Sequence, residues 1–217
     1  MQSVSVVPAA GAPAATATAD RRLAEVEALA GLLPEPTLAE LLAGPAAADS
    51  SWPTWHADEV VTGLFQGGTA GGATVRDPAP GSRWPAVPEH DLVVTLYADA
   101  QPADWGVEEL RYGFPDAGLT PQFAERVVRL ARHAHQRWLA GDDVLVRCQA
   151  GVNRSGLVTT LVLMLAGLSA GQAITLIRAR RSPWALCNGR FVEWAVQHGA
   201  QALGLAAPER PAEPSAA

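Results

Sequence analysis

Continuous apolar runs of strand length occur twice in the chain, at residues 90–97 (HDLVVTLY) and at residues 144–146 (VLV). Apolar and polar residues do not alternate regularly within either run, so each is expected to be a strand buried on both faces. Residues 58–68 (DEVVTGLFQGG) are interpreted as a strand, a turn and a second strand. The pattern therefore predicts strands near residues 60, 65, 93 and 145.

Helical spacing dominates the second half of the chain. One helix is expected to begin at Pro121, after the cap residue Thr120, and to end at Gly141. Its apolar positions share one face: Phe123, Val127, Leu130, Ala134 and Trp138. The further helices expected are residues 157–168, which form a long, mostly apolar segment, then 170–181 and 188–198.

Two shorter helical patterns precede the strands. Residues 20–33 and 37–44 place apolar positions at helical spacing, and Thr37 is a cap candidate for the second. Residues 1–19 are rich in Ala, Pro, Ser and Thr, without the pattern of a signal peptide or a membrane span, and are expected to be disordered.

The predicted domain organisation follows from these patterns. It consists of a partly disordered extension over residues 1–50 with short helices, a folded domain over 51–203, and a disordered tail over 204–217.

Composition narrows the class of protein. The chain has 217 residues, 48% of them hydrophobic, and a net charge of -6, which fits one well-buried domain and argues against a nucleic-acid binder. No membrane partner is expected. Its two cysteines do not form a disulfide framework, so a reducing, cytoplasmic location is predicted. The sequence alone specifies no oligomeric state.

The candidate chemistry lies in residues 144–156 (VLVRCQAGVNRSG), which read as a strand, a tight loop and the start of a helix. Such a loop points successive backbone N–H groups into one concavity, with the positive end of a helix dipole behind them. The space inside favours a tetrahedral oxyanion. Cys148 lies where the same groups favour a thiolate, which is a nucleophile at neutral pH.

The other positions of this loop have separate predicted roles. Gly151 lets the backbone turn without a Cβ, and Asn153 is expected to hold the loop by side-chain hydrogen bonds. Arg154 can donate to two phosphoryl oxygens at once, and Ser155 can donate to the sulfur as it leaves. The predicted phosphate-binding segment is Gln149, Ala150, Gly151, Val152, Asn153 and Arg154.

A Cys, five residues, an Arg and a Ser resemble the signature of the protein tyrosine phosphatase superfamily, and the sequence looks most like its dual-specificity type. The resemblance implies the cysteine-phosphatase fold, an α/β architecture with a central, mainly parallel or mixed sheet of four to five strands flanked by helices. It also implies a phosphocysteine intermediate, without a metal or a cofactor.

Proton delivery to the leaving oxygen requires an acid on a nearby loop. Asp116, in residues 113–120 (GFPDAGLT), is the best candidate, and its distance before Cys148 is similar to that of the family's acid loop. Asp99 and Asp104 are weaker alternates. The alternative is that Asp116 only shapes the turn before the next helix.

Arg147 departs from the family pattern, which usually has His directly before the nucleophile. The guanidinium would also favour a thiolate if it lies near the sulfur, so altered rather than lost activity is expected. A phosphate-binding pseudophosphatase is the alternative.

The substrate class follows from the loop. Residues 149–153 contain no basic residue, which favours a singly phosphorylated group. The expected partner is a phosphorylated protein, with phosphotyrosine and also phosphoserine or phosphothreonine as targets. The alternative substrate is a small metabolite, a nucleotide or an RNA 5′ phosphate.

Overall fold

The structure is a computed structural model that describes residues 12–44, 56–69, 90–103 and 107–205. The expected tail over residues 204–217 therefore lies almost entirely outside the described residues. None of the described helices combines the length and hydropathy needed to cross a membrane.

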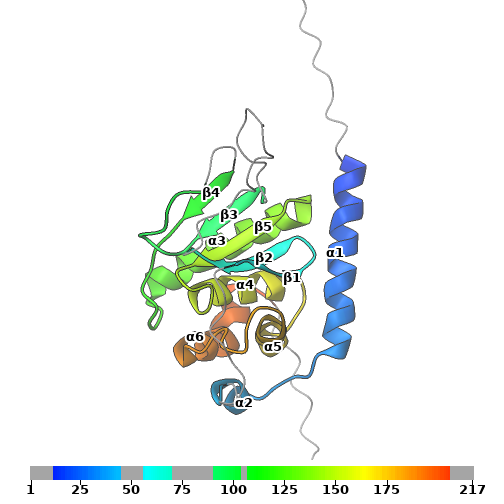
Figure 1. Ribbon diagram of the computed structural model, residues 1–217. Coiled ribbons are helices and arrows are strands. Elements are labelled where there is room, and N and C mark those ends of the chain that lie inside the picture. The colour runs from blue at the N-terminus through cyan, green and yellow to red at the C-terminus, as the bar shows by residue number, and fades with distance from the viewer. Residues whose placement is uncertain (1–11, 45–55, 70–89, 104–106, 206–217) are drawn as a thin grey trace, which may run out of the picture.

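A mixed five-stranded sheet forms the centre of the protein (Figure 1). Its strand order is β1-β2-β5-β3-β4, in which β1 runs antiparallel to β2 and every other neighbouring pair is parallel. The strands are β1 (Asp58–Val61), β2 (Leu64–Gly68), β3 (Leu92–Thr95), β4 (Glu108–Arg111) and β5 (Val144–Cys148). The α/β class predicted from the sequence is thus confirmed.

The edge strand β4 has no counterpart among the four strands located from the apolar pattern. Its sequence, EELR, contains a single apolar residue, and none of its four residues is buried. Strand recognition by apolar content fails for such a strand. The paired backbone of β3 forms the parallel ladder that defines it.

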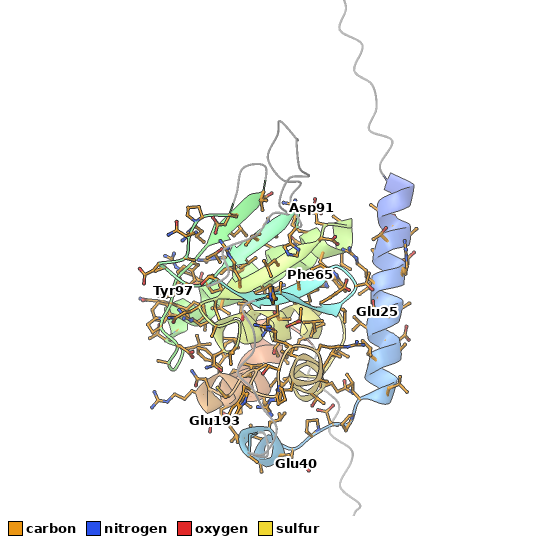
Figure 2. The ribbon with its side chains drawn as sticks, in the orientation of Figure 1. Glu25, Glu40, Phe65, Asp91, Tyr97 and Glu193 are labelled. Atoms are coloured by element: carbon orange, nitrogen blue, oxygen red, sulfur yellow. The ribbon has the colours of Figure 1, made fainter. Side chains whose placement is uncertain are left out.

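Helices pack side by side along the sheet, and side chains fill the space between the layers (Figure 2). The buried helix α4 (Arg154–Leu165) lies between α3 (Pro121–Ala140) and α5 (Ala170–Arg180), and it also contacts β5 and β2. The chain continues through α6 (Gly189–Trp194), a π-helical turn (Ala195–Gly199) and α7 (Ala200–Ala202).

Helix α4 differs from the expected residues 157–168 at both ends. It begins at Arg154, because the polar pair Arg154 and Ser155 forms its first turn, where an apolar pattern gives no signal. It ends at Leu165, just before Gly167 adopts a left-handed φ of 114°.

Two helices precede the sheet in the chain and pack against other elements of the domain. Helix α1 (Ala12–Leu32) contacts α3 and β1, and α2 (Leu38–Leu42) contacts α5 and α6. The cap predicted at Thr37 is present, and Glu40 completes it as a capping box. Helix α1 begins eight residues before the expected start, so residues 12–19 are helical where disorder was expected, because their alanines favour a helix without an apolar pattern.

Candidate active site

In the loop that joins β5 to α4, the backbone carbonyl groups accept hydrogen bonds from segments outside the loop. The carbonyl oxygens of residues 149–152 all accept hydrogen bonds from other segments. The carbonyls at the two ends, of residues 149 and 152, accept from the backbone N–H groups of Thr69 and Leu186. The guanidinium of Arg181 donates to the carbonyls of residues 150 and 151, and the amide of Gln66 also donates to the carbonyl of residue 151.

The N–H groups of the same loop therefore face the opposite side. In a trans peptide the N–H of each residue points away from the carbonyl of the residue before it. The N–H groups of residues 150–153 are directed away from Arg181 and Gln66, and the free N–H groups at the start of α4 lie next to them. The backbone thus forms a concave cup of donors, which attracts an oxyanion.

Gly151 is required by this arrangement for two reasons. Its φ of 70° lies in the left-handed region, which strains any residue that has a side chain. A Cβ at this position would lie 2.4 Å from the carbonyl carbon of Gly67 in β2. The close approach of the loop to β2 is what lets Gln66 reach the Gly151 carbonyl, at 3.0 Å.

The sulfur of Cys148 lies at the start of the loop and is almost completely buried. It lies 3.3 Å from the hydroxyl oxygen of Ser155, which is also buried, in the first turn of α4. The hydroxyl can donate to a sulfur that carries negative charge. This is the contact that the sequence predicts between the two residues.

Arg154 extends from the first turn of α4 and is held by two backbone carbonyls. Its Nη1 donates to the carbonyl oxygens of Leu96, just after β3, and of Phe114, in the loop of Asp116, both at 3.2 Å. Its guanidinium carbon lies 5.3 Å from the centre of the Tyr97 ring. The buried Nε has no partner among the described residues, so one edge of the guanidinium can bind an anion.

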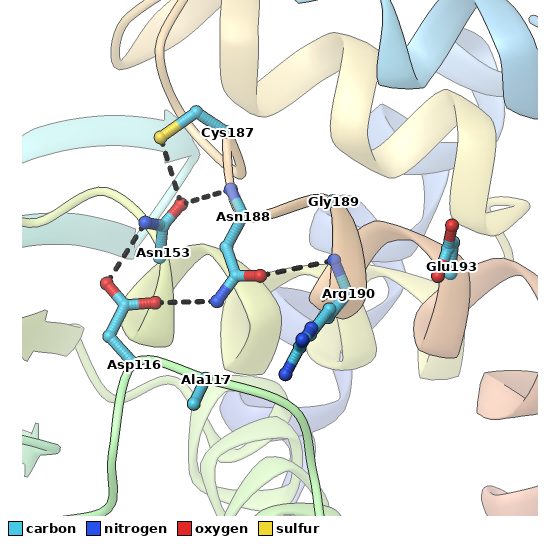
Figure 3. Close-up of a pocket in the computed structure, with 8 residues that line it drawn as sticks. All are labelled: Asp116, Ala117, Asn153, Cys187, Asn188, Gly189, Arg190 and Glu193. Atoms are coloured by element: carbon cyan, nitrogen blue, oxygen red, sulfur yellow. Dashed lines mark hydrogen bonds between the residues drawn. The ribbon is translucent and has the colours of Figure 1, made fainter.

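Asp116 is exposed and lies beside the cup, because its carboxylate accepts a hydrogen bond from the side chain of Asn153 at 3.0 Å (Figure 3). Asn153 thus connects the candidate acid to the loop that contains Cys148. Of the two alternates, Asp99 is exposed and Asp104 lies outside the described residues.

Arg147 is oriented differently from the expectation that its charge would support the sulfur. Its Nε donates to the Thr95 hydroxyl at 2.8 Å and its Nη2 contacts Glu109 at 3.0 Å and the Gln101 carbonyl at 2.8 Å. The ion pair with Glu109 compensates the positive charge. Arg147 is therefore a link between β5, β3 and β4.

Burial and the hydrogen bond between the two side chains both shift the pKa values of Arg147 and Glu109. Burial lowers the pKa of Arg147 from its ordinary value, against the opposing effect of Glu109. Burial by itself would raise the pKa of Glu109, but hydrogen bonds from Thr95, the Ala103 N–H and Arg147 outweigh it, so the pKa of Glu109 lies below its ordinary value.

Three residues near the loop have no role in the sequence interpretation: Gln66, Arg181 and Asn188. Gln66 is fully buried. Its signal in the sequence is a polar side chain within a predicted strand, because a buried polar group needs a hydrogen-bond partner. Arg181 follows α5 and looks like an ordinary cation at a helix end. Asn188 looks like a helix cap, and only its contact with Asp116 reveals more.

Comparisons with known proteins give structural matches only. No family model matches the chain, and no curated protein matches it. The structure of human DUSP28 is similar, with 27% sequence identity and a TM-score of 0.56 over 72% of this chain and 99% of that one. A mouse protein assigned to the dual specificity phosphatases, crystallised with zinc tungstate, has 24% identity and a TM-score of 0.55 over 73% of this chain and 94% of its own.

A third similar structure is that of the human tyrosine phosphatase-like serine/threonine/tyrosine-interacting protein. It has 18% identity and a TM-score of 0.53, over 68% of this chain and 97% of that one. At these identities the mouse protein and the third protein show a common fold, and the match to human DUSP28 covers almost all of that chain.

Proposed function

We propose that this chain belongs to the dual-specificity type of the protein tyrosine phosphatase superfamily, which its similarity to human DUSP28 supports, and that it hydrolyses phosphate monoesters with Cys148 as the nucleophile. The observation that carries the proposal is the contact of 3.3 Å between Cys148 and Ser155 in a loop whose carbonyl groups 149–152 are all engaged outside it. A sulfur nucleophile and a set of anion donors occur together there.

The first step transfers the phosphoryl group to sulfur. The thiolate of Cys148 attacks phosphorus, the bond from phosphorus to the leaving oxygen breaks, and protonated Asp116 gives its proton to that oxygen. The products of this step are a phosphocysteine, the free alcohol or phenol, and the Asp116 carboxylate.

The second step returns the enzyme to its starting state. The Asp116 carboxylate takes a proton from a water molecule that attacks phosphorus, and the bond between phosphorus and sulfur breaks. Ser155 donates a hydrogen bond to the sulfur as it leaves, so that Cys148 departs as a thiolate. Inorganic phosphate is released, and Asp116 is again protonated.

Charge on the transferred group is stabilised by the loop. The N–H groups of residues 150–153 and the Nε of Arg154, which has no partner in the described part of the chain, would donate to the phosphoryl oxygens. The two carbonyl contacts of Nη1 fix the guanidinium plane before substrate binds, which lowers the cost of reorganisation in the transition state.

The proposed substrates are phosphotyrosine and also phosphoserine or phosphothreonine in proteins. Residues 149–153 place no basic side chain in the cup, which suits a single phosphate rather than a cluster of phosphates. A small metabolite, a nucleotide or an RNA 5′ phosphate is the alternative substrate, and Arg147 motivates the further alternative of phosphate binding without turnover.

The first test is steady-state hydrolysis of an aryl phosphate in reducing buffer with a chelator. We expect wild-type turnover to resist the chelator, Cys148→Ser to abolish it, and Asp116→Asn to lower kcat by about 10²–10⁴-fold, the usual contribution of a positioned acid. Asp99→Asn, an exposed Asp in the preceding loop, is the matched control and should retain turnover. Turnover that survives Cys148→Ser would contradict the proposed mechanism.

The substrate class is tested with a panel of defined phosphopeptides, nucleotides and RNA 5′ phosphates. Higher kcat/KM for phosphopeptides supports the proposed class, and higher kcat/KM for the other compounds supports the alternative. Wild-type protein that binds vanadate but hydrolyses none of them would be a pseudophosphatase.

A further inference from the structure

Two asparagine side chains, not one, hold the carboxyl group of Asp116. The Nδ2 of Asn153 donates to one oxygen at 3.0 Å, and the Nδ2 of Asn188 donates to the other at 2.8 Å. The three side chains meet one another (Figure 3). All three line a surface pocket of about 830 Å³. Asn188 is 72 residues from Asp116 in the chain.

The orientation of both amides is set by other hydrogen bonds. The Oδ1 of Asn153 accepts the backbone N–H of Asn188 at 3.0 Å, and the Oδ1 of Asn188 accepts the backbone N–H of Arg190 at 3.1 Å. Since an N–H can only donate, each amide must turn its oxygen to the backbone and its NH₂ group to Asp116. The site therefore presents two donors to a group that can accept from both.

The turn that carries Asn188 is itself held in place. Arg178 donates from Nε to the Ala185 carbonyl at 3.1 Å and from Nη2 to the Leu186 carbonyl at 3.2 Å. Leu186 has a φ of 55°, which is unusual for a residue with a side chain, and its N–H donates to the Val152 carbonyl in the loop. These contacts fix the position of the next residues, including Asn188, relative to the cup.

The loop that contains Asp116 is mostly exposed, so few buried side chains hold it in place. Pro115, Asp116 and Ala117 are all exposed, and Phe114 is the nearest buried residue. The amide donors of Asn153 and Asn188 are the side-chain hydrogen bonds that the described residues make to Asp116. Loss of one donor would leave the carboxyl group free to turn away from the cup.

We propose that Asn188 is a positioning residue that sets Asp116 for proton transfer to the leaving oxygen. The inference rests on the proposed function, since it requires Asp116 to be the acid. Asn188 acts through Asp116 and does not touch the reacting atoms. Its removal should matter most when the leaving oxygen is a poor leaving group, because only then does the first step depend strongly on the acid.

Asn188 also caps α6, so a test must separate the two roles. Ser is about as good a cap as Asn, and its short side chain can still accept the Arg190 N–H but cannot reach Asp116. Asn188→Ser therefore keeps the cap and removes the donor. Gln136→Ser, which replaces an exposed amide on α3, is the matched control.

The experiment compares kcat/KM for phenyl phosphate, a poor leaving group, with that for an activated aryl phosphate, using the full chain. We expect Asn188→Ser to lose about 10-fold or more on phenyl phosphate and about 2-fold or less on the activated ester, in the same direction as Asp116→Asn. Gln136→Ser should match wild type on both substrates.

Other results overturn the inference in distinguishable ways. Equal losses on both substrates would indicate a purely structural role, and unchanged or faster hydrolysis of phenyl phosphate would show that Asn188 does not position the acid. If wild type hydrolyses neither ester, the proposed function fails and the inference fails with it. If Asn188→Ser has a lowered Tm, Asn188→Thr, which also keeps a capping hydroxyl without an amide donor, is measured at a temperature at which it is fully folded and must give the same selective loss.

Discussion

At the scale of single residues, Arg147 shows that a charged residue next to the nucleophile in the chain can have its partners elsewhere in the fold. It precedes Cys148 in the chain, yet its guanidinium contacts Thr95 and Glu109 on the neighbouring strands. Its side chain is only 2% exposed, and that of Glu109 is 12% exposed. A buried ion pair of this kind contributes little net stability compared with an apolar pair, but removal of one partner leaves the other uncompensated.

Glu109→Gln should therefore destabilise the protein by about 3 kcal/mol at pH 7, because Arg147 stays buried without its carboxylate. Equilibrium unfolding in urea measures the change. Glu125→Gln, which removes an exposed ion pair with Arg129 on α3, is the matched control and should unfold close to the wild-type midpoint. A Glu109→Gln protein as stable as the control would show that the pair is not needed.

The same pair predicts how stability depends on pH. The pKa of Glu109 is lower in the folded protein than its ordinary value, so its contribution is complete above the unfolded pKa of about 4.3 and is lost as the pH falls through the folded pKa. The free energy difference between wild type and Glu109→Gln should stay constant from neutral pH to about pH 5 and then narrow. A difference that grows on acidification would contradict this assignment.

At the scale of secondary-structure elements, helix α1 supplies a side chain that hydrogen-bonds to the backbone carbonyls at the C-terminal end of α3. Arg22 of α1 is buried, donates to the carbonyl oxygens of Trp138, Gly141 and Asp142, and pairs with Asp143. The last carbonyls of a helix lack partners within it and carry partial negative charge, so a guanidinium is a suitable donor for them. The contact joins the first helix to the segment that leads into β5.

Arg22→Met should lower the free energy of unfolding by about 2 kcal/mol, because it removes hydrogen bonds to carbonyls from a charged donor. Thermal unfolding should show a Tm lower by about 4–8 °C for a chain of this size. The adjacent Arg21 is exposed on the same helix, so Arg21→Met is the matched control and should leave Tm almost unchanged. Equal effects of the two variants would rule out the proposed contribution of Arg22.

At the scale of the whole molecule, the residues before β1 are connected to the rest at several places. Gln172 of α5 donates to the carbonyls of Ala30 and Leu33, and the Ser169 hydroxyl donates to Glu35 at 2.7 Å. Together with the contacts of α1 on α3 and of α2 on α6, these bonds join the first two helices and the segment between them to the helices that follow the sheet. The domain start at residue 51 remains a prediction.

Deletion of residues 1–44 tests that prediction. We expect the shortened protein to have a Tm lower than that of Arg22→Met, because the deletion removes the Arg22 contacts and also uncovers the apolar surface that α1 and α2 bury. Far-UV circular dichroism during heating should show one cooperative transition for the full chain. A shortened protein with the wild-type Tm would support a separate extension over residues 1–50.

Local sequence determined the parts of the candidate site that lie close together in the chain. Cys148, Arg154 and Ser155 fall within eight residues of one another, and the strand before them and the helix after them have clear apolar patterns. The contact of Cys148 with Ser155 was predictable because backbone geometry over so short a loop leaves few alternatives. The same holds for the caps at Thr37 and Thr120.

Only the tertiary structure decided the partners of these residues. Asp116 lies 72 residues from Asn188, and Arg147 lies 38 residues from Glu109. Pairs so distant depend on the strand order and on the packing of α4, which no local pattern specifies. The charged edge strand β4 was missed for the same reason, since its backbone pairing with β3, and not its side chains, makes it a strand. Hydrogen bonds between distant segments form only after the sheet has brought them together.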